Sequence, residues 1–278
     1  MLENEEQSQN FWEELCGTNA FISLGLKEIN NESLSIFDKW YMEYYPFLYK
    51  YLMLNEINNK DVLEIGLGFG TVGEQLALHS NSYIGLDYSI NPVKMMNQRF
   101  VWKNITHKAK AIQGDAKSLP FDDNIFDFIV SIGCLHHTGN TKKAIEEVYR
   151  VLKPAGKAMI MLYSKGKIRN NIIEPLFYFV VKTIKKPKTY SALKFNNLSE
   201  FKRALKDSDS DGNVAPITET FSKNEVKEIF SNFSKVSINK ENLQDINIPF
   251  INKFINRKKL LNNIAKKIGI DLYICASK

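Results

Sequence analysis

The segment 62–71, with the sequence VLEIGLGFGT, decides the fold class of this protein. Residues 62–65 are apolar apart from one carboxylate, as in a short buried strand, and three glycines at two-residue spacing follow them. Glycine lacks a Cβ, so it allows a sharp turn and the close approach of the backbone to a ligand. A strand, a glycine-rich turn and a helix in this order predict the first unit of a doubly wound α/β sheet, with a ligand site at the carboxyl end of the strand.

The same alternation continues along the chain. Short apolar or β-branched runs are separated by amphipathic stretches of about 10 to 15 residues, a pattern typical of βαβ units and a parallel sheet. The predicted strands are 61–65, 82–86, 110–113, 126–132, 157–163, 235–238 and 272–276. The predicted helices are 71–79, 91–102, 140–152, 172–184, 198–205, 222–230 and 253–267. The expected fold class is α/β, with a Rossmann-like, doubly wound, mostly parallel seven-stranded sheet.

The pattern divides the chain into three expected regions. Residues 1–57 are rich in aromatic side chains and predict an N-terminal helical cover. Residues 58–164 and 221–278 form the sheet-bearing core, which the segment 165–220 interrupts. We expect that segment to be an inserted helical lid that contributes to an acceptor site.

Composition limits the function. The chain has 278 residues, 44% of them apolar, which is enough for one substantial core. The three cysteines, Cys16, Cys134 and Cys275, lie far apart in the sequence and suggest neither a disulfide framework nor a zinc site. No run approaches the roughly 18 apolar residues of a membrane span, and the net charge of +6 is distributed over short, separated lysine runs. We therefore expect a cytoplasmic protein that binds no nucleic acid.

One acidic segment could suggest a metal site. Residues 207–212, with the sequence DSDSDG, resemble half of a calcium loop. Such a loop needs a glutamate six residues after its glycine, where this chain has Thr218. A capped turn is the favoured interpretation, and no metal is expected.

Two later motifs indicate what the glycine turn binds. Gly85-Leu86-Asp87 places a carboxylate at the end of the second predicted strand, where it can accept hydrogen bonds from both hydroxyls of a ribose. After the third strand, Asp115 can accept a hydrogen bond from an exocyclic amine and Ala116 can offer its backbone N–H to a ring nitrogen, as adenine requires. Thr71 stands where a nicotinamide dehydrogenase would have glycine or alanine, and no phosphate-binding lysine follows the turn. The motifs favour a nucleoside without a diphosphate.

Five segments in chain order resemble class I S-adenosylmethionine-dependent methyltransferases, of the type that includes the ubiquinone and menaquinone C-methyltransferases. They are LEIGLGFGT at 63–71, GLDYS at 85–89, GDAKSLPF at 114–121, FDFIVSIGCLHHTGN at 126–140 and VLKPAGKAMIMLY at 151–163. The flanking segments are similar to bacterial methyltransferases of unassigned substrate. Leu67 and Ser164 depart from the residues common at these positions in relatives. The resemblance implies S-adenosylmethionine as cofactor and S-adenosylhomocysteine as product.

The resemblance also implies roles for individual residues. Glu64, Gly66 and Gly68 would line the methionine and ribose side, Asp87 with Tyr88 the ribose, Asp115 with Ala116 the adenine, and Ile132 with Gly133 the amino-acid part.

Methyl transfer is an in-line displacement in which alignment does most of the work, so a base is optional. His136 and His137 follow the fourth strand, where His136 can serve as a general base or have a positioning role. Tyr163 ends the fifth strand and is a second catalytic candidate. Trp40, Tyr44 and Tyr45, together with His137, are candidates for the acceptor site, where aromatic rings can wall the cavity or screen a sulfonium; ordinary packing is the alternative.

The expected function is methyl transfer from S-adenosylmethionine to a small molecule, lipophilic or amphipathic, at O, N or C. One alternative is a regulator or partner subunit that binds the cofactor without turnover. Another is a tRNA or protein methyltransferase, although the fourth strand lacks the Asn/Asp-Pro-Pro-aromatic motif. The apolar helix 172–184 predicts a buried lid helix or a surface that docks a second protomer, and the lysines after it allow a peripheral membrane contact.

Overall fold

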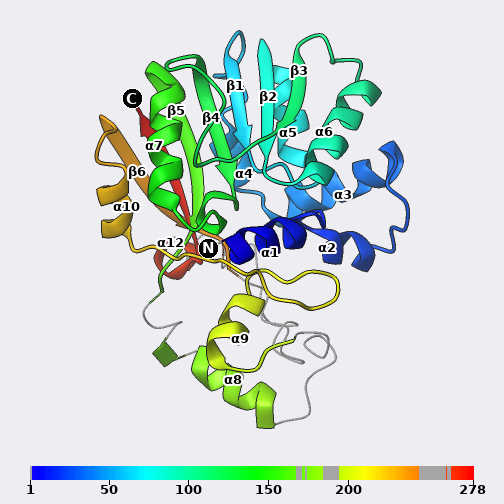
Figure 1. Ribbon diagram of the computed structural model, residues 1–278, viewed down its shortest axis with the longest axis vertical. Coiled ribbons are helices and arrows are strands. Elements are labelled where there is room, and N and C mark those ends of the chain that lie inside the picture. The colour runs from blue at the N-terminus through cyan, green and yellow to red at the C-terminus, as the bar shows by residue number, and fades with distance from the viewer. Residues whose placement is uncertain (1, 167–170, 173, 184–193, 244–260, 262–263) are drawn as a thin grey trace.

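The computed structural model describes residues 2–166, 171–172, 174–183, 194–243, 261 and 264–278 (Figure 1). The helices are α1 (Leu2–Trp12), α2 (Thr18–Ser23), α3 (Asn31–Tyr44), α4 (Leu48–Leu52), α5 (Thr71–His79), α6 (Ile90–Trp102), the 3-10 turn η1 (Leu135–His137), α7 (Thr141–Val151), α8 (Glu174–Thr183), α9 (Leu198–Ala204), α10 (Lys223–Ile229) and α12 (Ala265–Ile268). The strands are β1 (Asp61–Ile65), β2 (Ser82–Asp87), β3 (Ala109–Gln113), β4 (Phe126–Ile132), β5 (Leu152–Tyr163), β6 (Lys235–Glu241) and β7 (Asp271–Ser277).

The strands form one seven-stranded sheet in the order β3-β2-β1-β4-β5-β7-β6. Strands β1 to β5 pair in parallel, whereas β7 runs antiparallel to both β5 and β6. The predicted doubly wound, mostly parallel sheet of seven strands is confirmed. Strand β5 begins earlier than the predicted 157, because Leu152 pairs with Phe126 before a register shift in the β4–β5 ladder.

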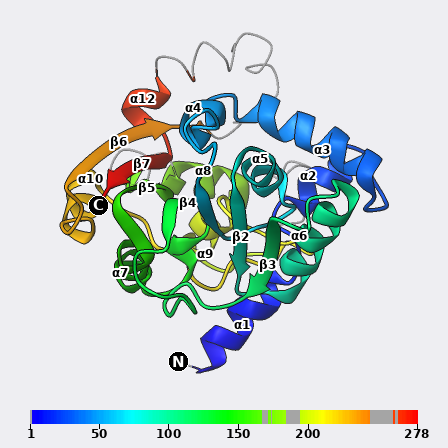
Figure 2. The ribbon, with the colours of Figure 1, turned by 90° about the horizontal axis from the view of Figure 1, so that it is seen from above.

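Helices cover both faces of the sheet (Figure 2). Successive residues of β1 point to opposite faces, so Val62 belongs to the core beneath α4, α5 and α6 and Leu63 to the core beneath α7 and α10. Both side chains are fully buried. This arrangement leaves the carboxyl ends of β1 to β5 free at one edge, which is where a doubly wound sheet binds its ligand.

The N-terminal segment closes this edge (Figure 1). Helix α1 crosses the carboxyl ends of the strands, and Glu13, just after it, accepts hydrogen bonds from the backbone N–H groups of Ile90 and Asn91 at the start of α6, both at 3.0 Å. A carboxylate at a helix N-terminus satisfies backbone donors that have no partner within the helix. The predicted cover over the site edge is therefore attached to the core by specific contacts.

A buried arginine joins the cover to the glycine turn. Arg99 of α6 is 1% exposed and donates to the backbone oxygen of Phe69 at 2.6 Å. Its guanidinium binds both carboxylate oxygens of Asp38 on α3 at 2.8 Å and Glu74 on α5 at 2.9 Å. The same Asp38 accepts a hydrogen bond from Thr71 at 2.6 Å. A buried guanidinium needs such paired acceptors, so these contacts fix the turn and α3 in one arrangement.

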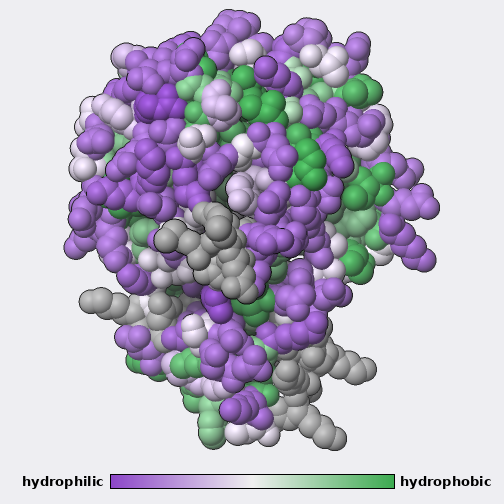
Figure 3. All heavy atoms as spheres, in the orientation of Figure 1, coloured by the Kyte–Doolittle hydropathy of each residue, from purple (hydrophilic) through white to green (hydrophobic). Residues whose placement is uncertain are grey.

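The inserted segment forms a lobe beyond α1 (Figure 1) that contains α8 and α9. Helix α8 is less buried than expected: Val181 is 1% exposed, but Leu176 and Phe179 are each 63% exposed. Apolar side chains lie around much of the helix, and α9 packs against one side of it. Figure 3 shows that much of the surface in this view is hydrophilic, with hydrophobic residues scattered over the lower lobe.

Some sequence predictions fall outside the described residues. The lysines at 185, 186 and 188 do so, as does most of the predicted helix 253–267, of which only the end overlaps α12. Within the part of the chain that the structure describes, no helix has the length and apolar character needed to cross a membrane. The division into cover, core and lid stays a prediction.

Candidate active site

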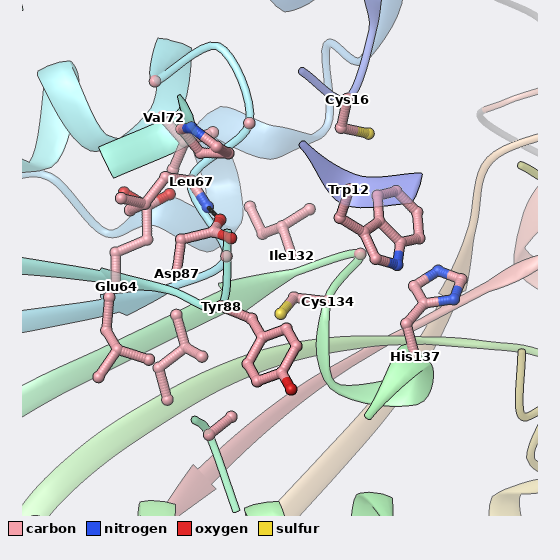
Figure 4. Close-up of a pocket in the computed structure, with 18 of the residues that line it drawn as sticks. Trp12, Cys16, Glu64, Leu67, Val72, Asp87, Tyr88, Ile132, Cys134 and His137 are labelled. Atoms are coloured by element: carbon pink, nitrogen blue, oxygen red, sulfur yellow. Dashed lines mark hydrogen bonds between the residues drawn. The ribbon is translucent and has the colours of Figure 1, made fainter. Parts of the chain in front are cut away.

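A cavity of about 170 Å³ lies at the carboxyl ends of β1, β2 and β4 (Figure 4). Every residue assigned to the cofactor by resemblance lines it: Glu64, Gly66, Gly68, Asp87, Tyr88, Asp115, Ala116, Ile132 and Gly133. The N-terminal cover contributes Ser8, Trp12 and Cys16, which the sequence did not indicate. We call this the first cavity.

The glycine turn has a backbone conformation that other residues rarely adopt. Gly66, Gly68 and Gly70 have φ angles of 88°, 51° and 81°. A Cβ on Gly66 would lie 2.4 Å from the Cβ of Cys134, closer than two carbon atoms can pack. Only glycine adopts this turn without backbone strain. At Gly66, Cys134 also leaves no room for a side chain.

Asp87 ends β2 inside the first cavity. One carboxylate oxygen accepts the backbone N–H of Leu67 at 2.7 Å, and the other accepts that of Ser89 at 3.0 Å. Burial raises the pKa of Asp87 to about 6, although these hydrogen bonds oppose the shift. Because a carboxylate has about four lone-pair sites, each oxygen can still accept a hydroxyl from a ligand. The two backbone bonds fix the orientation of this carboxylate inside the first cavity.

Glu64 lies deeper, on β1, and is 2% exposed. The hydroxyl of Tyr83 donates a hydrogen bond to its carboxyl group. Burial raises the pKa of Glu64 to about 8, so the group is mostly protonated at neutral pH. A protonated carboxyl can donate as well as accept, which distinguishes Glu64 from Asp87 in the same cavity.

Gly133 shows where open space begins. Its φ is 71°, and a Cβ built on it would meet no atom within 4 Å. Together with Ile132 it lines both the first cavity and a second, larger one of about 410 Å³. The end of β4 is thus a shared wall, to which Trp12 and Cys16 also contribute.

Aromatic rings form part of the wall of the second cavity. Trp40, Tyr44 and Tyr45 of the predicted acceptor site all line it, as does Tyr163. The ring centroids of Trp40 and Tyr44 are 5.3 Å apart in a stacked arrangement, and Tyr44 meets Tyr45 edge to face at 4.7 Å. These contacts fix the ring orientations, so packing and cavity lining are compatible roles here.

Three polar side chains lie close together where the two cavities meet: Tyr163 and Asp207 line the second cavity, and His137 lines the first. The hydroxyl of Tyr163 donates to Oδ1 of Asp207 at 2.9 Å, and Oδ2 of Asp207 lies 3.5 Å from Nε2 of His137. Nδ1 of His137 lies 2.7 Å from the backbone oxygen of Ile217, which can only accept, so Nδ1 carries a proton. In the neutral ring Nε2 is then the basic nitrogen, facing a carboxylate. Burial raises the pKa of Asp207, so this carboxyl group beside His137 holds a proton more readily than an exposed aspartate.

The two neighbouring histidines lie differently. His137 lines the first cavity and packs against Trp12 with ring centroids 4.6 Å apart (Figure 4). His136 is fully buried, lines neither cavity, and its ring packs 4.0 Å from that of Tyr163. Burial, followed by the charges of His137 and Lys206, lowers the pKa of His136 well below its usual value. The structure therefore places His136 in a supporting position behind Tyr163, which disfavours the general-base role and not the positioning role.

Sequence reasoning missed two buried carboxylates of the second cavity. The sequence predicts a capped turn at Asp207 and indicates no role for Asp271, yet both line the second cavity. Asp271 is 1% exposed and accepts a hydrogen bond from Asn242 at 2.8 Å. An aspartate at the edge of an apolar strand is a weak signal of a site, because most such residues face solvent.

Comparison with known proteins agrees with this geometry. Residues 63–160 match the family model described as a methyltransferase domain. Residues 63–160 therefore carry a methyltransferase domain. It is 33% identical over 106 residues to phosphoethanolamine N-methyltransferase 2 of Caenorhabditis elegans, a match that covers 38% of this chain and 24% of that protein. It is 34% identical over 171 residues to the uncharacterized protein MJ1252 of Methanocaldococcus jannaschii, covering 59% and 63%.

A solved structure has the same fold at low identity. It is phosphoethanolamine N-methyltransferase 2 of Haemonchus contortus in complex with phosphomonomethylethanolamine and S-adenosylhomocysteine, with a TM-score of 0.54, 20% identity, and coverage of 83% of this chain and 52% of that one. The chain thus spans between about a quarter and two thirds of the curated relatives named above. The family match covers the strand ends that form the first cavity.

The first cavity fits S-adenosylmethionine, the cofactor of this domain family. Asp87 has two oxygens held by backbone hydrogen bonds, as a ribose would require, and the side chain of Asp115 beside Ala116 is 37% exposed. Gly133 leaves open space between this cavity and the next. The glycine turn, residues 66–71, contains no lysine or arginine that could pair with a phosphate. A nucleoside with an amino-acid tail needs no such residue.

Proposed function

We propose that this protein transfers a methyl group from S-adenosylmethionine to a small molecule held in the second cavity. The observation that carries the proposal is the shared wall: Ile132 and Gly133 line both cavities, so ligands in the two can meet at the end of β4. A displacement needs its reactants in line and about 3 Å apart, and adjacent cavities provide that alignment. The names of methyltransferase relatives support the same reaction class.

The residues of this chain do four things in the proposed reaction. Asp87 and Asp115 orient the nucleoside, and Gly133 leaves the path between cavities open. The aromatic rings of the second cavity exclude water from the acceptor. Tyr163 donates a hydrogen bond that orients Asp207 beside His137, and Asp207, whose pKa is raised by burial, can accept a proton. When bound, the cofactor supplies an electrophilic methyl group on a sulfonium.

Calorimetric titration with S-adenosylmethionine, S-adenosylhomocysteine and NAD tests the cofactor assignment. The first two should bind and raise the melting temperature by mass action, and NAD should not. Asp87→Ala should weaken S-adenosylhomocysteine binding by about 2 kcal/mol, roughly 30-fold, as expected when a charged acceptor is lost. Glu56→Gln, whose side chain is 57% exposed and pairs with Lys157, is the control and should bind normally. Equal binding by Asp87→Ala would remove that residue from the site.

Turnover distinguishes an enzyme from a cofactor-binding regulator, the alternative that the fold alone permits. Production of S-adenosylhomocysteine that depends on an added acceptor supports an enzyme. Tight cofactor binding with no product from any acceptor in a broad metabolite extract would favour the regulator. A cytoplasmic location, a homodimer and a membrane contact through the exposed face of α8 stay predictions.

A further inference from the structure

Helix α8 is apolar on two opposite faces. One face packs against α9, and its Val181 is 1% exposed. On the other face Leu176 and Phe179 are each 63% exposed, and Val180 is 36% exposed. Because a helix turns about 100° per residue, these three positions share one stripe about 100° wide, and Val181 lies on the far side. A surface helix normally has polar residues opposite its buried stripe, so the second apolar face of α8 is open to a partner.

The open face of α8 lies at an accessible place on the molecule. Helix α8 is at the end of the lobe that is farthest from the sheet (Figure 1). Ile172, four residues before Leu176, is 60% exposed and continues the apolar stripe beyond the start of the helix. Single exposed apolar residues are common on protein surfaces, but several on one helix face mark an interaction surface.

The sequence that contains α8 and α9 is strongly basic. Residues 165–206 include eleven lysines and arginines and two glutamates, a surplus of nine positive charges in a chain whose net charge is +6. The rest of the chain therefore has a net charge of −3. One of the two glutamates, Glu174, is 2% exposed, whereas Lys182 in the last turn of α8 is exposed to solvent. The open apolar face thus belongs to the positively charged part of the chain.

The acidic residues that follow this segment lie on the side of the lobe that faces the core. Asp207 and Asp209 line the second cavity together with Trp12 of α1 and Tyr163 of β5. The negative charge is therefore directed toward the cavity, away from the exposed face of α8. This separation leaves the outer side of the lobe with positive charge and apolar side chains together.

Three kinds of partner could cover such a surface, and one of them satisfies both of its properties. A nucleic acid would be attracted by the positive charge, but phosphate contacts would leave Leu176 and Phe179 in water. A second copy of the chain could cover these side chains, but pairing two α8 faces would bring two basic segments together. A lipid surface with negative headgroups accepts the apolar side chains and attracts the lysines.

We propose that the exposed face of α8 binds the surface of an anionic lipid bilayer. Leu176 and Phe179 enter the boundary between headgroups and acyl chains, and Lys182 lies near the negative headgroups. With ten residues, α8 is too short to cross a bilayer, so it lies in the plane of the interface. Lipid binding of this kind does not depend on the proposed methyl transfer.

Flotation of the full chain with lipid vesicles measures this binding. One set of vesicles contains phosphatidylcholine alone, and the other contains about 30% phosphatidylserine. The wild type should bind the anionic vesicles at least about tenfold more tightly than the neutral ones, and added salt should weaken binding because it screens the charges. Equal binding to the two kinds of vesicle, or binding to neither, would overturn the proposal.

Two matched pairs of variants connect the binding to α8. Leu176→Ser combined with Phe179→Ser should lower vesicle affinity at least about tenfold, whereas Val101→Ser, at a 59% exposed apolar position of α6, should leave it unchanged. Lys182→Glu should weaken binding to the anionic vesicles much more than Lys227→Glu, which changes a lysine in the last turn of α10. Melting temperatures equal to that of the wild type, measured by circular dichroism, show that the variants are folded.

The other partners give different results in the same set of proteins. Vesicle binding that survives the double serine substitution would assign it to another surface and overturn the proposal. A wild-type dimer in analytical ultracentrifugation that this substitution dissociates, with no vesicle binding, would identify the partner as a second copy. A complex with duplex DNA in a gel-shift assay, again without vesicle binding, would identify a nucleic acid.

Discussion

Replacement of Glu64 by glutamine should stabilise the free protein at neutral and alkaline pH. The carboxyl group of Glu64 is 2% exposed, and burial raises its pKa from 4.5 to about 8. In the unfolded chain the group ionises near pH 4.5, whereas in the folded chain it keeps its proton. The stability of the folded state is therefore full below pH 4.5 and falls as the pH rises toward 8.

The size of the effect follows from the shift. Each pH unit between the two pKa values costs about 1.4 kcal/mol, so the loss between pH 5.5 and pH 7.5 is about 2 to 3 kcal/mol. Glutamine does not titrate, and its side-chain oxygen can still accept the hydrogen bond from Tyr83. The free energy of unfolding of Glu64→Gln, relative to wild type, should increase by that amount over the same range.

Urea denaturation at several pH values measures this difference. Glu147→Gln is a matched control of opposite sign, because hydrogen bonds from Arg150 lower the pKa of Glu147. Glu147→Gln should destabilise the protein at pH 7, and its deficit should shrink as the pH falls through the lowered pKa. If Glu64→Gln and the wild type lose stability in parallel between pH 5.5 and 7.5, the burial argument for Glu64 is wrong.

Three further predictions test the site and its support. Asp38→Ala leaves the buried Arg99 without its bidentate partner and should cost about 2 to 3 kcal/mol in the free energy of unfolding, measured in urea; a loss below about 1 kcal/mol, as for an exposed ion pair, would contradict the proposed link between α3 and the glycine turn. Gly133→Ala should cost only about 1 to 2 kcal/mol in stability, since φ is positive but the space is open, yet weaken S-adenosylhomocysteine binding in calorimetry; unchanged affinity would place the ligand elsewhere. His136→Phe should keep turnover within a few fold, whereas His137→Phe should lower turnover at least tenfold with cofactor affinity unchanged. The reverse order would restore His136 as the base.

That Asp87, Asp115 and the glycines of the turn line one cavity could be predicted because their signals are local. Asp87 and Asp115 each follow a strand that the sequence shows clearly, and parallel strands bring their carboxyl ends to one edge. The glycines of the turn indicate its backbone conformation, because Gly66 and Gly68 have positive φ angles that other residues rarely adopt. Order along the chain was therefore enough to place these residues together.

The second cavity depends on contacts that order along the chain does not encode. Asp207 meets Tyr163 across 44 residues, and its neighbours in the sequence suggest a turn. Arg99 contacts Asp38 across 61 residues, and in isolation it is an ordinary helix residue. Each of these pairs forms only when separate elements pack together. The sequence around a carboxylate does not show which distant element will supply its hydrogen-bond donor.

The sequence by itself determined the sheet, the glycine turn and the carboxylates of the first cavity, because each belongs to a short segment with its own backbone geometry. The tertiary structure alone decided which of two adjacent histidines reaches a cavity: the turn of η1 directs His137 toward Asp207 and buries His136 against Tyr163. It also decided that Asp207 and Asp271, which come from segments far apart in the chain, both line the second cavity. Charge and proton affinity at a site depend on burial and on neighbours across space, and these exist only after folding.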